Sequence, residues 1–153
     1  MNPPDGFHPD RSHLPGASGT GWEVRVDQER NRLFLNLGAL DLEQAKEVVL
    51  AMGRWVWKLT PGYTVMSDFT LFLPVDQKVA LYITRGQTVL RKSGMGKGVR
   101  VVSSHLTALQ FSRRGKQVGL DVDTVQTLAE ARVILDRWER EQERQAGKPE
   151  EKS

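Results

Sequence analysis

Apolar and polar side chains alternate in two short segments near the start of the chain. Residues 22–26 place Trp22, Val24 and Val26 on one side, and residues 33–37 repeat the same period of two with leucines. Such alternation is typical of strands that are buried on one face. The polar stretch between the two segments suits a turn, so together they predict an antiparallel hairpin.

From Asp41 to Leu59 the apolar residues recur at spacings of three and four, which predicts a helix with one buried face. Asp41 suits the N-cap position, because its carboxylate can accept a hydrogen bond from a backbone N–H of the first turn. Pro61 and Gly62 come directly after this pattern and predict its end.

The rest of the chain alternates between the two patterns. A glycine-rich turn at residues 94–98 follows the second predicted helix, and Glu130 lies three residues after Thr127, which is the spacing of a capping box. The predicted strands cover residues 63–66, 99–102 and 122–125, with residues 67–70 opening into a loop, and further helices are predicted to begin near Pro74, near Ser103 or Ser104, and near Thr127.

The expected fold is a single α/β domain, because strands that alternate with helices are joined by right-handed crossovers in a mostly parallel sheet. An N-terminal β-hairpin opens this sheet, and about four helices pack on it. Residues 1–20 hold four of the seven prolines and few apolar side chains. We therefore expect a flexible leader over residues 1–20, a domain over residues 21–142 and a flexible tail over residues 143–153.

Four blocks of the sequence carry a resemblance to a known family: LFLNLGALDLEQAKEVVLAM (33–52), LTPGYTVMSDFTLFLPVD (59–76), GVRVVSS (98–104) and LQFSRRGKQVGL (109–120). In hydrophobic spacing and turns, residues 22–140 resemble the SpoIIAA-like fold, which includes the STAS domains of anti-sigma-factor antagonists. The resemblance is closest to the small bacterial STAS/SEC14-like proteins. It implies a non-catalytic regulatory module that binds a protein partner.

In the antagonist branch of this family, a strand ends in Asp and leads to a phosphorylated Ser at the start of the next helix. Asp68 matches the end of the strand, whereas the predicted helix start holds Asp76 and no Ser or Thr. The resemblance therefore implies a module without the usual phospho-switch serine. Thr70 is the nearby hydroxyl in this loop, and we expect it to cap the loop rather than to be modified.

The composition offers few groups for catalysis. The chain has no cysteine, and of its three histidines only His105 lies in the expected domain, beside Ser104. Neighbours in sequence do not point their side chains at each other, so these two residues do not suit a nucleophile and its base. Asp41, Asp68 and Asp76 could lie near one edge of the sheet, but Asp41 suits a cap and Asp76 the first turn of a helix. We expect no enzymatic activity, no cofactor and no metal site.

Charge is distributed unevenly along the chain. Residues 74–120 contain nine basic residues and one acid, a net charge of +8, whereas residues 121–153 contain nine acids and six bases, a net charge of −3. A basic segment can attract an acidic protein, an anionic lipid or a nucleic acid. Aromatic residues do not interleave with the basic ones and no recognition-helix pattern is present, so we do not expect a nucleic acid. The basic segment suits an ordinary solvated surface, internal pairing with the acidic last helix, or an acidic protein partner.

Leu50 and Trp57 lie on a side of the first helix other than its core stripe. This surplus apolar strip suits a partner interface or a homodimer, although a neighbouring helix could cover it instead. No apolar run approaches the roughly 20 residues that span a bilayer, and the chain begins without the pattern of a secretory signal, so we expect a cytoplasmic protein.

Two functions remain open on this sequence. The first is an interaction module, whose candidate interface residues are Leu50, Trp57, Asp68, Thr70, Asp76, Arg113 and Arg114. The alternative is a carrier or sensor of a small apolar ligand or lipid, which needs an apolar cavity between helices and sheet. The candidate pocket residues, all of which also suit an ordinary core, are Tyr63, Phe69, Phe72, Tyr82 and Phe111.

Overall fold

The structure, a computed structural model, describes residues 13–146 apart from the side chains of Gln110, Arg114 and Gln117. Within this part of the chain, four α-helices pack on a six-stranded sheet. The strands are β1 (Gly16–Gly19), β2 (Trp22–Asp27), β3 (Arg32–Leu37), β4 (Thr64–Phe69), β5 (Lys97–Val102) and β6 (Asp121–Val125). The helices are α1 (Leu42–Trp55), which continues into the 3-10 turn η2 (Val56–Lys58), α2 (Gln77–Lys92), α3 (His105–Val118) and α4 (Leu128–Ala146).

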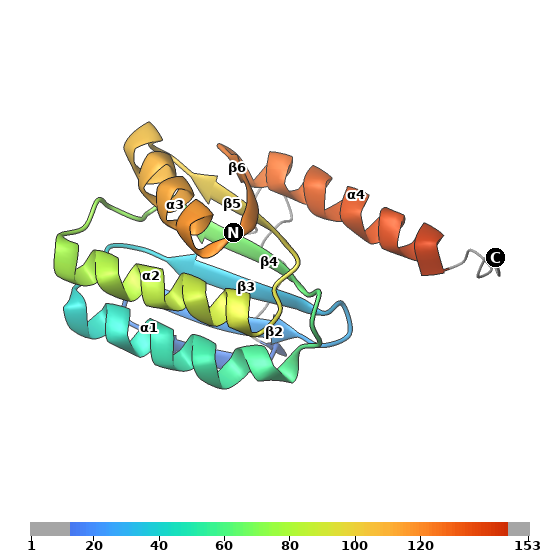
Figure 1. Ribbon diagram of the computed structural model, residues 1–153, viewed down its shortest axis with the longest axis horizontal. Helices are drawn as coiled ribbons and strands as arrows, with labels where there is room; N and C mark the ends of the chain where they lie inside the picture. The colour runs from blue at the N-terminus through green and yellow to red at the C-terminus, as the bar shows by residue number, and fades with distance from the viewer. Residues whose placement is uncertain (1–12, 147–153) are drawn as a thin grey trace.

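The strands lie in the sheet in the order in which they occur in the chain (Figure 1). β1, β2 and β3 pair antiparallel, whereas β3 to β6 pair parallel. This arrangement confirms the predicted α/β fold, with a mostly parallel sheet and an antiparallel hairpin at its start. The register places Leu35 beside Ser67 and Ser67 beside Arg100, so these three side chains share one face of the sheet.

The two faces of the sheet are covered unequally. Each crossover advances the chain by one strand in the same direction, so right-handed connections place α1, α2 and α3 on one face, while α4 follows the last strand and lies on the other (Figure 1). The main core lies under the three helices. A smaller core under α4 consists of Met66, Val99, Val101, Ala131, Leu135 and Trp138.

The helix starts follow their predicted caps in three cases. Asp41 forms a reciprocal capping box with Gln44, in which each side chain accepts from the backbone N–H of the other residue. The backbone N–H of Glu130 donates to Thr127 Oγ1, as the predicted spacing required. Ser104, rather than Ser103, provides the hydroxyl at the start of α3.

The structure corrects the predicted start of the second helix. α2 begins at Gln77, with Asp76 as its N-cap, and Pro74 lies in the preceding loop rather than in the first turn. Asp76 Oδ1 accepts a hydrogen bond from the backbone N–H of Val79 at 3.0 Å. β4 also continues to Phe69, because the polar residues at its end still pair with β5 through the backbone.

Both predicted boundaries of the domain need correction. The predicted leader over residues 1–20 is wrong at its end, because Gly16–Gly19 form β1 and pair with β2. Glycine permits this pairing, since a Cβ at Gly16 would collide with the carbonyl oxygen of Val24. The predicted tail from residue 143 is wrong at its start, because α4 continues to Ala146 through residues that favour helix. Residues 1–12 and 147–153 lie outside the described part of the chain.

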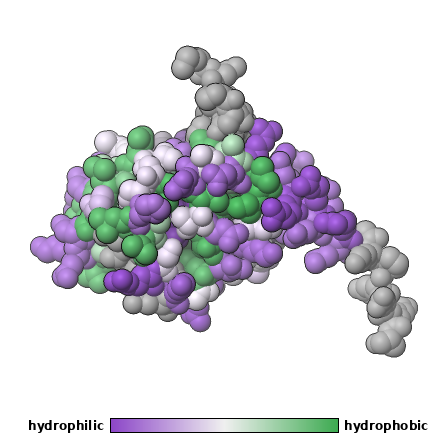
Figure 2. Space-filling view, turned by 90° about the horizontal axis from the view of Figure 1, so that it is seen from above, coloured by the Kyte–Doolittle hydropathy of each residue, from purple (hydrophilic) through white to green (hydrophobic). Residues whose placement is uncertain are grey.

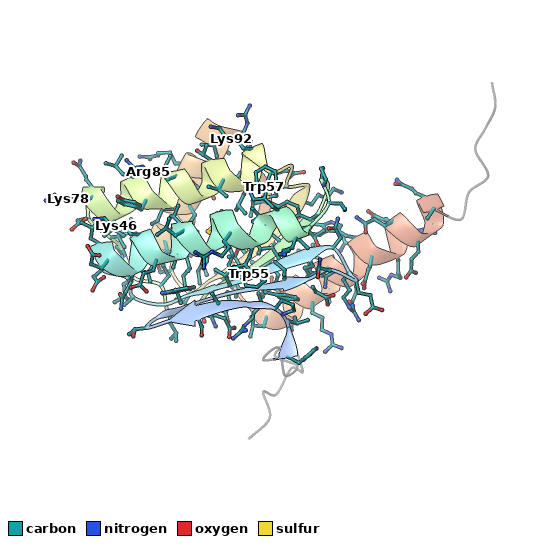
Figure 3. The ribbon with its side chains drawn as sticks, turned by 90° about the horizontal axis from the view of Figure 1, so that it is seen from below. Lys46, Trp55, Trp57, Lys78, Arg85 and Lys92 are labelled. Atoms are coloured by element: carbon teal, nitrogen blue, oxygen red, sulfur yellow. The ribbon has the colours of Figure 1, made fainter. Side chains whose placement is uncertain are left out.

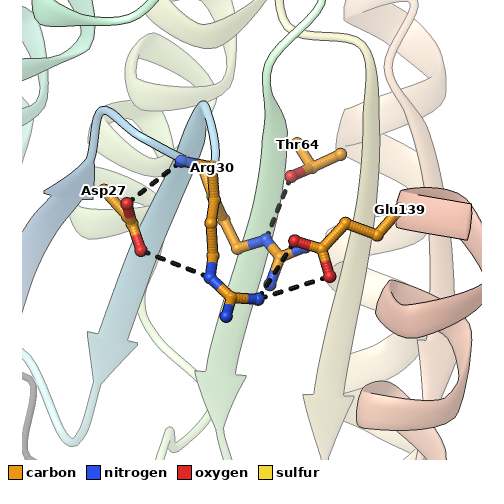
Figure 4. A network of polar contacts seen from close by, with 5 residues as sticks. Asp27, Arg30, Thr64 and Glu139 are labelled. Atoms are coloured by element: carbon orange, nitrogen blue, oxygen red, sulfur yellow. Dashed lines mark hydrogen bonds and ion pairs between the residues drawn. The ribbon is translucent and has the colours of Figure 1, made fainter. Parts of the chain in front are cut away.

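A small polar network joins α4 to the hairpin (Figure 4). Arg30 Nη1 lies 3.0 Å from Glu139 Oε1, and Arg30 Nε lies 3.8 Å from Asp27 Oδ2. The neighbouring Arg32 is buried and donates from Nε to Thr64 Oγ1 at 3.2 Å. Burial lowers the pKa of Arg32, and the charge of Glu139 counteracts this shift.

None of the described helices combines the length and the apolar character that a membrane-crossing helix requires.

Candidate functional site

The outer side of α1 carries the apolar strip that the sequence indicated. Leu50 is 73% exposed and Trp57 is 69% exposed, so no neighbouring helix among the described residues covers them. Figure 3 shows Lys46 on α1, Trp57 in the turn η2 that follows it, and a row of basic side chains along the adjacent α2, namely Lys78, Arg85 and Lys92. This side of the molecule therefore combines exposed apolar groups with positive charge.

The structure buries Asp68, which corrects its predicted place in a partner interface. The Asp68 carboxylate accepts a hydrogen bond from Thr70 Oγ1 at 2.8 Å and another from the Thr70 backbone N–H at 3.1 Å. Thr70 thus has the loop-capping role expected from the sequence. Asp76 is exposed, but its carboxylate is held by the N-terminus of α2.

Four leucines form an apolar surface where the parallel strands end, and the sequence analysis missed them. Leu71 and Leu73 lie in the loop after β4, and Leu106 and Leu109 lie in the first turns of α3, with 55–73% of each residue exposed. We call these four residues the carboxyl-edge surface. Figure 2, which looks onto the α3 side of the molecule, shows several groups of apolar residues on this face, separated by polar ones.

Two contacts hold the segments of the carboxyl-edge surface together. Ser103 Oγ donates to the carbonyl oxygen of Thr70 at 2.9 Å. Phe72 turns inward between the two exposed leucines of the loop, and its ring packs edge-on against Phe111 of α3 at 4.9 Å between centroids. Because Phe72 is anchored in this way, the residues on either side of it face away from the core.

A sequence pattern could have indicated part of this surface. Leu106 and Leu109 are three residues apart and lie off the buried stripe of α3, which passes through Ala108 and Phe111. Arg113 follows four residues after Leu109 on the same side of the helix and is exposed, as its predicted interface role requires. Arg114 is also in α3, but its side chain lies outside the described residues.

A cavity of about 50 Å³ lies between the three helices and the sheet. Of the five predicted pocket residues, Phe69, Tyr82 and Phe111 line it. Tyr63 and Phe72 belong to the packed core instead. The walls are mainly apolar and include Leu35 and Val65 of the sheet, Met52 of α1, and Ile83 and Leu90 of α2.

Three buried polar side chains border the cavity, namely Arg100, Gln87 and Ser67. Arg100 is 4% exposed, and its guanidinium carbon lies 4.7 Å from the ring centroid of Phe111 and 6.0 Å from that of Phe69. Burial lowers the pKa of Arg100 to about 10. Gln87 is 5% exposed and donates from Nε2 to the Phe111 carbonyl oxygen at 3.3 Å, while its Oε1 accepts no hydrogen bond.

The residues considered for catalysis or metal binding do not converge. Ser104 Oγ accepts from the backbone N–H of Thr107 and donates to its hydroxyl, so it caps α3 and is not paired with the exposed His105. Across residues 13–146, no three acidic, histidine or cysteine side chains gather as metal ligands would.

Comparison of the chain with models of known protein families gives no match, and a comparison with curated proteins gives none either.

Proposed function

We propose that this chain is a non-catalytic, STAS-like interaction module that binds a protein partner through the carboxyl-edge surface. The observation that carries the proposal is the exposure of Leu71, Leu73, Leu106 and Leu109 on two segments that are tied to each other. Large apolar side chains gathered in one place, rather than scattered singly, are typical of interaction sites. The order of strands and helices and the sequential sheet support the STAS-like assignment.

The partner suited to this surface presents apolar residues bordered by acidic ones. Arg113 is exposed on the same side of α3 as Leu106 and Leu109, and Lys78 is exposed in the first turn of nearby α2. Opposite charges at the rim of an interface steer the two proteins together, while apolar groups at its centre provide most of the affinity.

The module we propose acts without a phospho-switch in the loop before α2. The position at the helix start is occupied by Asp76, which caps the helix with its carboxylate. The Thr70 hydroxyl donates a hydrogen bond to buried Asp68, and a phosphate on that oxygen would place two anions side by side. Partner binding would therefore be regulated elsewhere or be constitutive.

The test compares charge insertion at two exposed leucines. Leu109→Glu places an anion in the carboxyl-edge surface, whereas Leu50→Glu makes the same change at an exposed leucine on α1 and serves as the matched control. Each tagged protein is used to capture binding proteins from cells that produce it, with the captured proteins quantified by mass spectrometry. We expect Leu109→Glu to lower capture of the specific partner by about tenfold or more, and Leu50→Glu to leave it unchanged.

The opposite result has a clear meaning. Loss with Leu50→Glu and retention with Leu109→Glu would contradict the proposal and place the interface on the outer side of α1. Sedimentation velocity of the purified wild-type protein asks in parallel whether the partner is a second copy of the chain, in which case Leu109→Glu converts the dimer to a monomer.

The alternative function, a carrier or sensor of a small ligand, is favoured by one observation. The cavity between α1, α2, α3 and the sheet is lined mainly by apolar groups. Its volume of about 50 Å³ is small beside the roughly 150 Å³ of a cavity that binds benzene, so a phospholipid or long fatty acid would need a large opening of the helices.

A further inference from the structure

Arg100 is a buried cation without an anionic partner. Within residues 13–146 as described, its guanidinium group makes no ion pair and no hydrogen bond, although it lies almost wholly out of solvent. Stacking on Phe111 stabilises the charge from one side. No described residue accepts a hydrogen bond from the five N–H donors of the guanidinium group, and holding such a group mostly out of solvent is costly unless something satisfies it.

The place of Arg100 in the fold indicates that it does more than fill the core. A core that only had to be filled would be served better by an apolar side chain of similar length, because a well-packed apolar residue carries no desolvation cost. The guanidinium group instead borders a cavity, and Ser67 lies beside it on the adjacent strand and also borders that cavity. The space next to the cation is therefore partly open rather than filled by protein.

We propose that this cavity binds a small monocarboxylate, whose oxygens accept hydrogen bonds from Arg100 and from the Ser67 hydroxyl. The planar guanidinium group matches the two oxygens of a carboxylate. The short aliphatic part of the ligand contacts the apolar walls formed by Leu35, Val65, Ile83 and Leu90. This site lies beneath the helices and is separate from the carboxyl-edge surface, so it does not depend on the proposed protein partner.

Charge and volume define the ligand further. One buried cation balances one negative charge. Gln87 also lines the cavity, and its Oε1, which accepts no hydrogen bond, disfavours a second anionic oxygen nearby. A dicarboxylate or phosphate is therefore a poor fit. A cavity of about 50 Å³ is about a third of the roughly 150 Å³ of a cavity that binds benzene, so it has room for a ligand of only a few heavy atoms.

The test uses propionate as the probe and propionamide, its neutral analogue of the same shape, as the control. Thermal unfolding is followed with each compound at about 10 mM and equal ionic strength, because a ligand that binds the native state raises the Tm. We expect propionate to raise the Tm, propionamide and phosphate to leave it unchanged, and amide resonances near the cavity, such as the Gln87 side chain, to shift in NMR titrations with propionate.

Arg100→Met supplies the decisive variant, because it keeps the length of the side chain and removes its charge. Without ligand, we expect its Tm to be no lower than that of the wild type, and with propionate we expect the affinity to fall by about tenfold or more. Failure of wild-type protein to respond to propionate, in both unfolding and NMR, would overturn the proposal and leave water as the occupant. Equal binding by propionamide, or by folded Arg100→Met, would overturn it as well.

Discussion

The side chain of Tyr63 is fully buried in the core, so its hydroxyl group needs a hydrogen-bond partner within the protein. Its hydroxyl lies 2.6 Å from Ser93 Oγ and 3.2 Å from the carbonyl oxygen of Leu90. Burial raises the pKa of Tyr63, and the hydrogen bond with Ser93 offsets part of that shift. The phenol is thus a structural group that joins the segment just before β4 to the end of α2, in contrast to Arg100, whose guanidinium group makes no hydrogen bond with the described residues.

Tyr63→Phe removes this hydroxyl, and we expect it to lower the free energy of unfolding by about 1 kcal/mol at pH 7. The folded state holds the pKa of Tyr63 above its usual value of 10.0. Its contribution is therefore fully present below pH 10 and is lost as the pH rises through the folded pKa. The difference between variant and wild type should shrink in urea unfolding curves recorded above pH 10. Tyr82→Phe, at a half-buried tyrosine, is the control, and a difference for Tyr63→Phe that is constant with pH would contradict this account.

At the scale of the elements, α2 depends on a single side chain for its start. Asp76→Ala removes the acceptor for the Val79 N–H, and we expect a loss of about 1 kcal/mol in the free energy of unfolding. Asp76→Asn keeps an acceptor at the same place and should retain most of that stability. Thermal unfolding of both variants measures the effect. If Asn and Ala were equally destabilising, the charge of Asp76 rather than its capping bond would be its contribution.

Strands and helices whose apolar residues recur at a regular spacing could be predicted from the sequence. A strand that pairs through its backbone and shows no such pattern could not. β2 and β3 alternate visibly in sequence, whereas β1 is a run of small residues whose pairing needs only close approach of the main chain. Arg100 was missed for a related reason. Between Val99 and Val101 it reads as the polar position of a half-exposed strand, but β5 is covered by helices on both faces, so both sets of side chains are buried. Sequence spacing likewise could not show that Ser103, just before α3, binds the carbonyl oxygen of Thr70 in the loop after β4.

At the scale of the whole molecule, the acidic final helix does not neutralise the basic middle of the chain through the ion pairs seen here. Glu139 of α4 binds Arg30 in the hairpin, outside the basic segment. α4 meets that segment where the ammonium group of Lys97 lies 5.7 Å from the ring of Trp138. The exposed basic side chains along α2, including Arg85 and Lys92, therefore remain directed at solvent or a partner (Figure 3).

Apolar packing and an ion pair both attach α4 to the rest of the molecule, and two variants measure their contributions to stability separately. Trp138 is buried against Met66 and Val99, and we expect Trp138→Ala to lower the free energy of unfolding by about 3–5 kcal/mol, because it leaves a cavity in the smaller core. Glu139→Gln breaks the pair with Arg30, whose side chain is 53% exposed, and should cost at most about 1 kcal/mol. Urea unfolding in low salt and in about 1 M salt distinguishes the two, since screening reduces only the ionic effect. Equal losses for the two variants in low salt would mean that the network in Figure 4, rather than the packing of Trp138, holds α4 on the sheet.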